Sequence, residues 1–481
     1  MSDTPSSPNP TRQIRQRLRH TARISRHSFR TAVFLGGAAC VALFSLLFAV
    51  IAEKMLEWNS HITQGYWWSA LLMLPPAFAG IRWLTMKLAP EARGSGIPQV
   101  MAAMSMPQCP EQSRLVSLRQ SMWKIVLTAA GLLAGASIGR EGPSVQVGAA
   151  AMLAWGKWWQ KRPRLGIGFR PEALIAAGAA GGLAAAFNTP LAGVVFAIEE
   201  LGKGSAVRWD RLVMSAVLGA GFLSLAIVGN NPYFQLQQAI HAMQISWQAI
   251  AVCAIVNGAL GGLFAKALLA GPAAWLPKRH RSWAQRHPIW VAAVCGLLVA
   301  LLGMLTGGAT YGTGYEQASA LLNGQGADHM LFGIAKLGAT ILSYLAGIPG
   351  GIFTPSLAIG VGIGDNIAHL LPMGVDVRLI ALLSMAGFLA AATQAPITAT
   401  VIVMEMTRSQ EVTLMLLATA LLASFISRQF CPRPFYHSVG RNFRREAMHR
   451  HQAAQQAAHQ AASQATQQAV QQAAQQPGTQ K

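Results

Sequence analysis

The chain has 481 residues, of which 52% are hydrophobic and 11% are charged, and its formal net charge is +21. In a soluble protein this charge would suggest a nucleic-acid partner. Here the excess positive charge lies mainly in the two tails and in short loops between long apolar stretches. We therefore expect a protein of the lipid membrane that binds no nucleic acid. The five cysteines are scattered and odd in number, which argues against a disulfide framework or a metal motif.

Basic residues dominate the first 30 residues, which contain seven arginines and a single acid, Asp3. Arginines also follow the last apolar stretch, at Arg433, Arg441, Arg444 and Arg445. Because basic loops stay on the cytoplasmic side of a membrane, this bias predicts that both tails are cytoplasmic. An organellar transit peptide is the alternative interpretation of the Arg- and Ser-rich start, and no cleavable signal peptide is visible.

The apolar stretches between the tails predict helices. Many contain Gly or Pro and are shorter than the roughly 20 residues of a simple span, which predicts short, tilted and broken transmembrane helices. Period-2 strand patterns of any consequence are missing, so we expect an all-α polytopic membrane protein and no membrane barrel. The predicted stretches are 31–52, 66–90, 122–138, 143–157, 172–187, 190–201, 210–229, 246–275, 288–306, 329–346, 354–369, 377–392, 396–406 and 411–428.

A ten-residue pattern occurs twice. GREGPSVQVG at 139–148 and GIFTPSLAIG at 351–360 match at an offset of 212 residues, pairing Pro143 with Pro355. Proline is favoured in the first turn of a helix, so each copy is interpreted as a loop that enters a helix N-terminus. Helix N-termini carry partial positive charge, and two of them in one apolar chain suggest an anion site.

Two further blocks repeat in the same order: 94–100 resembles 312–318, and 181–200 resembles 387–406. Three ordered matches indicate a duplicated fold, and halves with an odd number of crossings would be inverted relative to each other. The predicted domains are a basic tail (1–30), two transmembrane halves (31–230 and 231–440) and an Ala/Gln-rich tail (441–481), disordered or weakly helical from Gln452.

The repeat separates structural from functional ionisable residues. Glu199 and Glu405 occupy equivalent positions, as do Lys124 and Lys336, which favours a scaffolding role such as pairing or helix capping. By contrast, Glu141 and Glu200 have no counterpart, because Phe353 and Met406 stand in their places. An ionisable group at bilayer depth costs at least about 2.5 kcal/mol, so these two unmatched acids are the better functional candidates.

Glu141 has two interpretations. It is either an acid that complements the dipole of its own helix or a tethered competitor for a bound anion. The second is favoured because we expect Gly139, Gly142, Gly350 and Gly351 to leave bare N–H groups that bind an anion. A bound anion would favour the protonated carboxyl and so couple proton uptake to anion movement.

Glu200, Ser95 and Tyr436 also have structural alternatives. Glu200 ends a long apolar run and would, in isolation, be a surface acid at a membrane boundary. Ser95 could cap the helix that begins at the following Ile-Pro, or donate its hydroxyl to an anion. Tyr436 lies beside Arg and Pro at the end of a span, where most tyrosines are interfacial aromatics.

Together, GSGIP at 94–98, GREGP at 139–143, GIFTP at 351–355 and Tyr436 resemble the CLC family of chloride channels and chloride/proton antiporters, from about Thr31 to Val439. The resemblance implies a CLC-type inverted repeat and a homodimer with one pathway per subunit. It also implies a prokaryotic type without a C-terminal nucleotide-binding (CBS) module.

The same resemblance assigns roles to individual residues. It implies an anion site formed by the hydroxyls of Ser95 and Tyr436 and by backbone N–H groups of Ile352 and Phe353, with an outer site at Arg140 and Gly142. Glu141 matches the gating glutamate and Glu200 the inner proton-transfer glutamate of the exchangers.

The prediction is therefore a transporter that exchanges chloride for protons across a bacterial inner membrane. We expect no enzymatic activity, no cofactor and no metal site, because no motif for them is present. A passive anion channel of the same fold is the first alternative. The second is a cation-coupled carrier in which Glu199 and Glu405 face each other.

Overall fold

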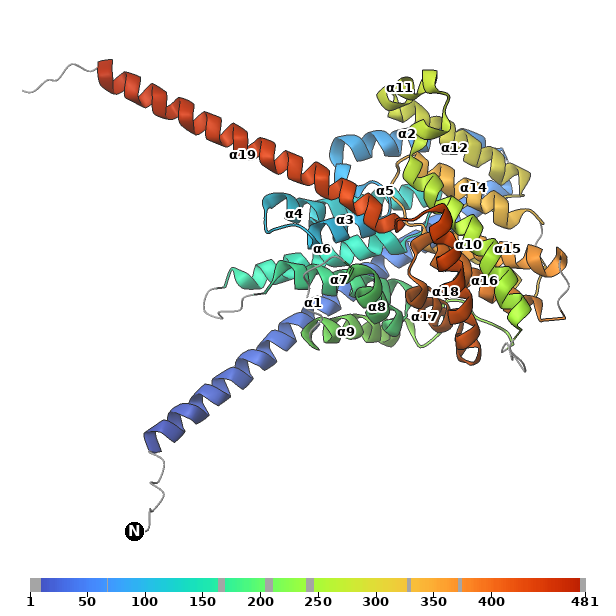
Figure 1. The fold of residues 1–481 in the computed structure, drawn as a ribbon, viewed down its shortest axis with the longest axis horizontal. Coiled ribbons are helices and arrows are strands. Elements are labelled where there is room, and N and C mark those ends of the chain that lie inside the picture. Colours follow the sequence, from blue (N-terminus) through green and yellow to red (C-terminus); the bar gives the residue numbers. More distant parts are fainter. Residues whose placement is uncertain are drawn as a thin grey trace, which may run out of the picture.

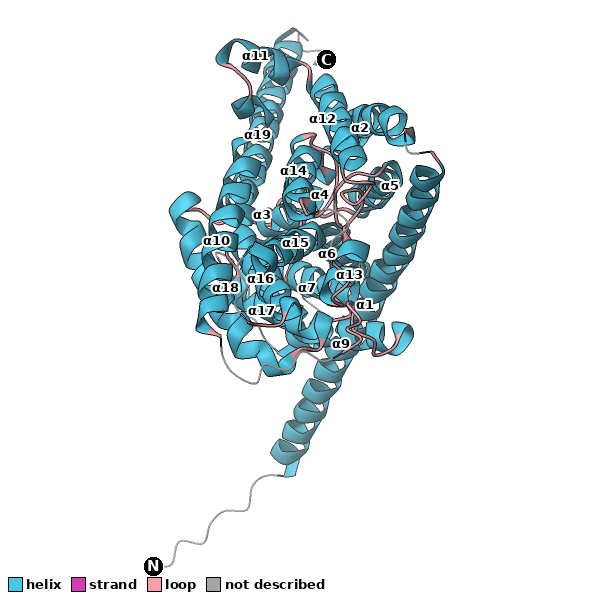
Figure 2. Cartoon of the chain, turned by 90° about the vertical axis from the view of Figure 1, so that its right-hand side faces the viewer, coloured by secondary structure: helices cyan, strands magenta, loops and turns pink. Residues whose placement is uncertain are grey.

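The structure is a computed structural model, and it describes residues 10–66, 68–162, 169–203, 211–238, 246–326, 330–370 and 374–475. Within these ranges the chain is helical apart from loops and two isolated β-bridges. Figure 1 and Figure 2 show helices of many lengths and tilts gathered into one bundle. The all-α prediction is confirmed.

The helices of the first half surround the predicted GREGP motif. In chain order they are α1 (Pro10–Gly65), α2 (Ser69–Leu88), η1 (Pro90–Ala92), α3 (Ile97–Met104), α4 (Pro110–Leu115), α5 (Leu118–Ala134), α6 (Glu141–Gln160), α7 (Pro171–Phe187), α8 (Pro190–Phe196), η3 (Ala197–Leu201) and α9 (Arg211–Val228).

The second half repeats this arrangement around GIFTP. Its helices are α10 (Trp247–Ala270), η4 (Pro272–Trp275), α11 (Lys278–Arg286), α12 (Pro288–Leu305), α13 (Tyr315–Leu322), α14 (Phe332–Leu345), α15 (Phe353–Leu370), α16 (Val377–Thr393), α17 (Pro396–Thr407), η5 (Gln410–Val412), α18 (Thr413–Phe430) and α19 (Phe435–Gln475). Every predicted stretch contains a helix. The helices α3, α4, α11, α13 and α19 lie outside those stretches, because they are too short or too polar to produce a long apolar run.

Helix length varies as the Gly and Pro breaks predict. Five described segments are long and apolar enough to cross a membrane: residues 28–65 of α1, α9, α10, α12 and residues 410–430. The apolar helices α7, α14, α16 and α17 are shorter than a full span. Shorter helices of this kind are expected where loops inside the bundle line a polar site.

Within each half, a glycine at an equivalent position lets two successive helices pack closely. A Cβ on Gly148 of α6 would overlap the carbonyl oxygen of Gly178 in α7, and a Cβ on Gly360 of α15 would lie 2.6 Å from the carbonyl oxygen of Ser384 in α16. Such contacts without side chains are a main source of stability between membrane helices. The repeat therefore preserves the packing of each broken helix against its successor.

The two halves meet at equivalent residues. Gly139 and Gly351 form an antiparallel bridge in which each N–H donates to the other's carbonyl oxygen, both at 2.7 Å. Gly139 and Gly351 are equivalent in the repeat. If a two-fold axis relates the two halves, such residues can bond to each other in this reciprocal way. This pairing agrees with the inverted repeat that the sequence predicts.

Both ends of the described chain leave the bundle on one side (Figure 1). The predicted boundaries at 30/31 and 440/441 fall inside α1 and α19, so neither marks a break in secondary structure. From 452 to 475 the Ala/Gln-rich tail is helical, as the high helix propensity of Ala and Gln allows. Residues 1–9 and 476–481 of the predicted tails lie outside the described residues.

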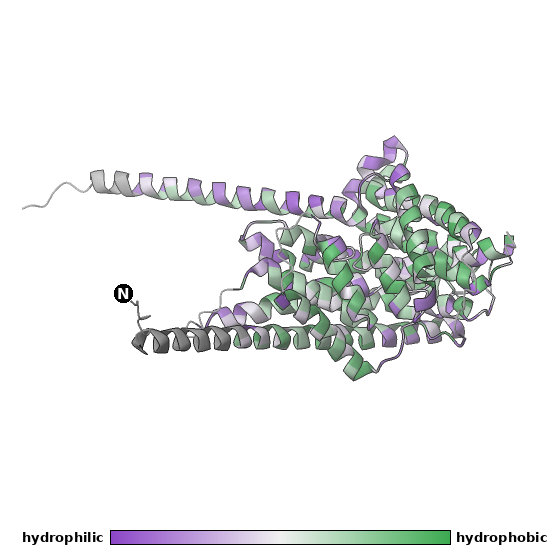
Figure 3. Ribbon diagram, turned by 60° about the horizontal axis from the view of Figure 1, so that its bottom comes forward, coloured by the Kyte–Doolittle hydropathy of each residue, from purple (hydrophilic) through white to green (hydrophobic). Residues whose placement is uncertain are grey.

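Figure 3 shows hydrophobic residues throughout the bundle and hydrophilic residues along the projecting part of α19.

Candidate functional site

Three loops that precede helices are joined inside the bundle. The N–H of Gly94 donates to the carbonyl oxygen of Ile348 (3.2 Å), and the N–H of Gly350 donates to that of Gly94 (3.1 Å). The Gly139–Gly351 bridge joins the loop before α6 to the loop before α15. These bonds hold the starts of α3, α6 and α15 next to one another.

The loop glycines are not all bare donors, and this corrects one prediction. The N–H groups of Gly139, Gly350 and Gly351 are used in the bonds between loops and are not free for an anion. The free donors must therefore come from the helix starts themselves, where the first N–H groups have no partner within the helix. Ile352 and Phe353 lie at such a start, as do Arg140 and Gly142 at the start of α6.

Gly142 allows the first motif to touch the second. A Cβ at this position would overlap Ser95 Oγ and lie 2.9 Å from the carbonyl oxygen of Ser95. A Cβ on Gly351 would lie 3.0 Å from the amide nitrogen of Gly142. Glycine is therefore required where the three helix starts converge.

Ser95 and Tyr436 place two hydroxyl groups at this convergence. Ser95 is 2% exposed, and Tyr436, the second residue of α19, is fully buried. The two side chains are neighbours, yet neither hydroxyl has a hydrogen-bond partner of normal geometry among the described residues. Helix α3 has Gly96 as its N-cap and no side-chain cap, and Tyr436 does not reach the bundle surface. The helix-cap and interfacial interpretations of these residues are therefore wrong.

Aromatic rings enclose the site on the side of α15. Phe353 stacks on Tyr436, with ring centroids 5.9 Å apart and planes at 16°. The rings of Phe187 and Phe196 each lie 6.3 Å from Phe353. The rings are buried and make this side of the site apolar, and an apolar surrounding strengthens the interaction of an anion with nearby dipoles.

Glu141, the first residue of α6, is fully buried. Its nearest polar neighbour is Thr354, and neither carboxylate oxygen has a hydrogen bond of normal geometry among the described residues. A helix-start acid that satisfied its own loop would accept well-formed hydrogen bonds from backbone N–H groups, and the Glu141 carboxylate has none of normal geometry among the described residues. A buried carboxylate without such partners is free to exchange a proton or to compete with an anion.

The side chain of Arg140 points away from this carboxylate toward α1. Its guanidinium donates to the carbonyl oxygen of Ala49 (2.7 Å) and to Glu53 Oε1 (2.9 Å). Arg140 therefore contributes only backbone groups to the site, while its charged side chain anchors the GREGP loop to α1.

Glu200 is the second buried acid, on the π-helical turn η3. It is 1% exposed, which contradicts its interpretation as a surface acid. Its closest charged or titratable neighbours are Lys203 Nζ (3.8 Å) and His437 Nδ1 (3.7 Å). No hydrogen bond of normal geometry reaches its carboxylate within the described ranges.

The matched acids have the predicted scaffolding role. Glu199 accepts hydrogen bonds from the N–H groups of Ile397 (3.2 Å) and Thr398 (2.6 Å) at the start of α17. Glu405 accepts the equivalent bonds from Leu191 (3.1 Å) and Ala192 (2.6 Å) at the start of α8. Since N–H donors occupy both carboxylates, they do not form the facing pair that a cation-coupled carrier needs.

The matched lysines are scaffolding too. Lys336 Nζ donates to the carbonyl oxygens of Thr310 (2.9 Å) and Gly312 (2.8 Å), just before α13. Lys124 Nζ donates to Gln146 Oε1 (2.8 Å), and Gln146 packs beside the backbone of Gly96 at the start of α3. Each buried lysine thus supports the Gly-x-Gly loop of its own half.

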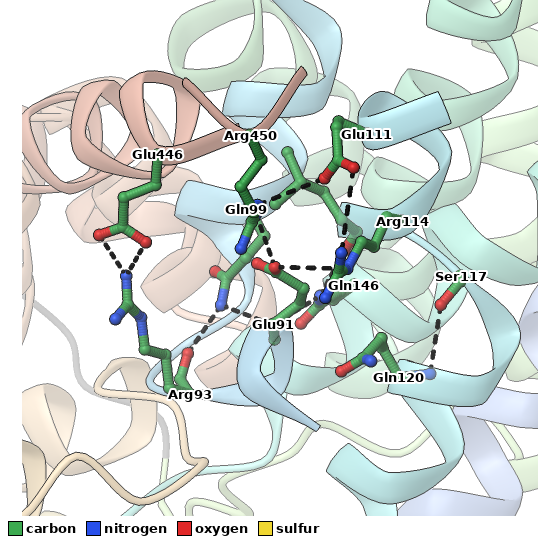
Figure 4. Close-up of polar contacts among 11 residues, drawn as sticks. Glu91, Arg93, Gln99, Glu111, Arg114, Ser117, Gln120, Gln146, Glu446 and Arg450 are labelled. Atoms are coloured by element: carbon green, nitrogen blue, oxygen red, sulfur yellow. Dashed lines mark hydrogen bonds and ion pairs between the residues drawn. The ribbon is translucent and has the colours of Figure 1, made fainter. Parts of the chain in front are cut away.

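A charged cluster fixes α19 to the loops near α3 (Figure 4). Glu91, 2% exposed, forms an ion pair with Arg450 Nη2 of α19 at 2.8 Å, and Arg450 Nε lies 3.4 Å from Glu111. Arg93 donates to both carboxylate oxygens of Glu446 at 2.7 Å. Because Ser95 precedes α3 and Tyr436 begins α19, these ion pairs help to hold the two hydroxyls together.

The sequence predicted eight site residues, but it did not predict several residues that border them in the structure. Phe187 and Phe196 gave no local signal, because they are ordinary residues of apolar stretches that only the fold brings to Phe353. Thr354 lies inside the GIFTP motif and is a neighbour of Glu141 in the structure. His437 follows Tyr436 directly, so its titratable ring beside a predicted site residue was a usable signal.

Comparison with known proteins adds to this geometry. Residues 77–428 match the family model described as voltage gated chloride channel. The H(+)/Cl(-) exchange transporter ClcA of Yersinia pseudotuberculosis serotype IB (strain PB1/+) is 32% identical over 398 residues, covering 77% of this chain and 78% of that protein. ClcA of Vibrio parahaemolyticus serotype O3:K6 (strain RIMD 2210633) is 31% identical over 422 residues, covering 82% and 85%.

The fold is also similar to solved structures. The crystal structure of a slow cyanobacterial Cl-/H+ antiporter superposes with a TM-score of 0.71 at 25% sequence identity, covering 86% of this chain and 98% of that chain.

Proposed function

The chain belongs to the voltage-gated chloride channel (CLC) family, and we propose that it exchanges chloride for protons across a membrane. The Yersinia and Vibrio relatives are named as exchange transporters, and the similar cyanobacterial protein is a Cl-/H+ antiporter, which supports exchange over a passive channel. The observation that carries the proposal is that the carboxylate of Glu141 and the hydroxyls of Ser95 and Tyr436 are all buried near the converging helix starts without a hydrogen-bond partner of normal geometry among the described residues.

In this proposal chloride binds where α3, α6, α15 and α19 begin. The hydroxyls of Ser95 and Tyr436 and the backbone N–H groups of Ile352 and Phe353 donate to the ion. Backbone groups of Arg140 and Gly142 form the outer part of the site. The partial positive charge of the helix N-termini stabilises the negative charge of the ion and makes the site selective for anions.

Glu141 acts as the gate. The ionised carboxylate occupies the anion path, and a chloride ion in the dry site favours the protonated form, because two negative charges repel strongly there. The neutral carboxyl then leaves the path and carries a proton with it. Glu200 exchanges that proton with the inner side, so chloride and proton movements are linked.

The proposed location is a bacterial inner membrane with both termini in the cytoplasm. Both helical ends leave the bundle on one side, and the basic residues of the tails favour the cytoplasmic face. We also propose a homodimer with one pathway per subunit. Exposed apolar side chains on neighbouring α8, η3 and α17 support a contact face there: Leu191 (46% exposed), Ile198 (54%) and Ile397 (49%).

The direct test is flux in liposomes that contain the purified protein. A chloride gradient should drive protons against their own gradient, and the proton and chloride fluxes should keep a fixed ratio. Chloride flux without proton movement would overturn the exchange mechanism in favour of a passive channel.

A further inference from the structure

The buried position of Glu200 raises the question of how protons reach it. Glu200 is 1% exposed, so its carboxylate has no direct contact with bulk water. A group that exchanges protons with solution must therefore lie between Glu200 and the surface. Within the described ranges, only His437 and Lys203 approach its oxygens closely enough to form an ion pair.

His437 has the geometry of such a group. Its Nδ1 lies 3.7 Å from Glu200 Oε1, and its Nε2 lies 3.0 Å from the carbonyl oxygen of Lys203. The side chain is 19% exposed, so the ring spans the distance between the buried acid and the surface. Nδ1 itself is buried and has no hydrogen-bond partner of normal geometry within the described residues.

The bond to Lys203 fixes the proton arrangement of the ring. A carbonyl oxygen only accepts, so Nε2 must carry a hydrogen. In the neutral ring Nδ1 is then the unprotonated nitrogen, and its lone pair faces Glu200. In the charged ring Nδ1 also carries a hydrogen, and the bond at Nε2 is unchanged. A proton can therefore pass between Nδ1 and the carboxylate without the ring turning over.

Lys203 does not serve this purpose. Its ammonium group is 41% exposed and lies 3.8 Å from Glu200. A lysine side chain keeps its proton throughout the neutral pH range, whereas histidine gains and loses one within it. Lys203 supplies positive charge beside Glu200, and its carbonyl oxygen orients the ring of His437.

We propose that His437 relays protons between the cytoplasmic solution and Glu200, an inference that rests on the proposed exchange function. The imidazolium donates the Nδ1 proton to the Glu200 carboxylate, which leaves a neutral ring and a neutral carboxyl. The neutral side chain then swings about its Cα–Cβ and Cβ–Cγ bonds to bring Nδ1 to the exposed side, takes a proton there from water, and returns to Glu200 as the imidazolium. The reverse sequence returns a proton from Glu200 to the cytoplasm, so the step is balanced in either direction.

The position of His437 also links this relay to the anion site. It follows Tyr436, whose hydroxyl lies at the convergence of the helix starts. The first turn of α19 therefore carries an anion ligand and a proton relay on adjacent residues. A movement of this turn would change access for both ions together.

The test uses His437→Gln in the full-length protein in liposomes. The Gln amide retains a donor for the Lys203 carbonyl but cannot be protonated. We expect the number of protons moved per chloride to fall by at least about tenfold, in line with the usual contribution of a positioned acid–base group. The matched control is His451→Gln, which removes a histidine further along the same helix and should keep the wild-type ratio.

Chemical rescue separates a relay from a structural role. In His437→Ala, added imidazole should restore proton movement in proportion to its concentration, because free imidazole can replace the lost ring. An unchanged proton-to-chloride ratio in His437→Gln would overturn the relay, and so would a failure of imidazole to rescue His437→Ala. If the wild-type protein moves chloride but no protons, the exchange function itself fails, and that outcome is recognised before any variant is compared.

Discussion

Glu199 and Glu405, 206 residues apart, cap each other's half of the molecule. Glu199 follows α8 and binds the N–H groups at the start of α17, while Glu405 lies in the last turn of α17 and binds those at the start of α8. This reciprocal arrangement gives both acids a structural role. It leaves Glu141 and Glu200, which have no counterparts in the repeat, as the acids available for transport.

The capping pair predicts a loss of stability without a loss of coupling. Glu199→Ala and Glu405→Ala should each lower the free energy of unfolding by about 1 to 2 kcal/mol, because each removes a charged helix cap. The two effects should be similar, since the two sites are equivalent. Denaturant unfolding in detergent measures the first effect, and liposome flux measures the coupling. A changed proton-to-chloride ratio with unaltered stability would contradict the scaffolding assignment.

Glu141→Gln should produce chloride flux that no longer depends on pH and that carries no protons. The variant keeps the size of the side chain but removes its charge and its proton, so the gate stays neutral at every pH. Chloride and proton fluxes measured across a range of pH values test this. Glu405→Gln is the control, because that acid caps a helix and should retain pH-dependent exchange.

Glu200→Gln should abolish proton movement while chloride still permeates. Glu200 is bordered by Lys203 and His437 and is not one of the proposed anion ligands, so the anion path does not require its charge. Parallel recordings of chloride efflux and of internal pH would reveal the difference. Normal coupling in this variant would mean that protons take another route.

Gly142→Ala should weaken chloride binding by at least about fivefold. The added methyl group would overlap Ser95 Oγ, and overpacking of a tight site costs about 1 to 3 kcal/mol. Calorimetric titration with chloride measures the affinity. Gly80→Ala in α2 is the control, because a Cβ there meets no atom within 4 Å and should leave binding unchanged. Equal affinity in the two variants would place the anion elsewhere.

The loop before α16 should contribute acid-sensitive stability. Arg378 donates to Asp376 at 2.6 Å and holds the pKa of that carboxyl below its usual value. A lowered folded-state pKa stabilises the protein above the unfolded-state pKa, near 4, and this stabilisation is lost as the pH falls through the folded-state value. We expect a difference of about 0.5 kcal/mol, because solvent screens the pair.

This prediction is checked by comparing the melting temperatures of the wild-type protein and Asp376→Asn at neutral and acidic pH. The wild-type advantage should be present at neutral pH and absent in acid. An advantage that persists in acid would show that the ion pair is not its source.

The order of the helices was predictable from the sequence because each apolar stretch is a local signal. Every predicted stretch contains a helix, and the breaks follow Gly and Pro. The short helices α3 and α13 escaped this signal, since eight residues are too few for a recognisable apolar run. The motifs in front of α3, α6 and α15 compensated for that, because glycine and proline mark turns and helix starts directly.

The use of individual N–H groups was not predictable from the sequence. Gly139, Gly350 and Gly351 look like free donors in the chain, but their hydrogen bonds are made to partners more than 200 residues away. Likewise, the local sequence around Glu200 is typical of a membrane boundary, and only its burial beside His437 reveals a protected acid.

By itself, then, the sequence determined the broken helices, the duplication and the residues that differ between its two copies, because all of these depend on local composition or on matching positions. Only the tertiary structure decided which donors remain free and which acids are shielded from water. It also decided which titratable ring adjoins Glu200. The physical reason is that hydrogen bonding and burial depend on neighbours that folding brings from the other half of the chain.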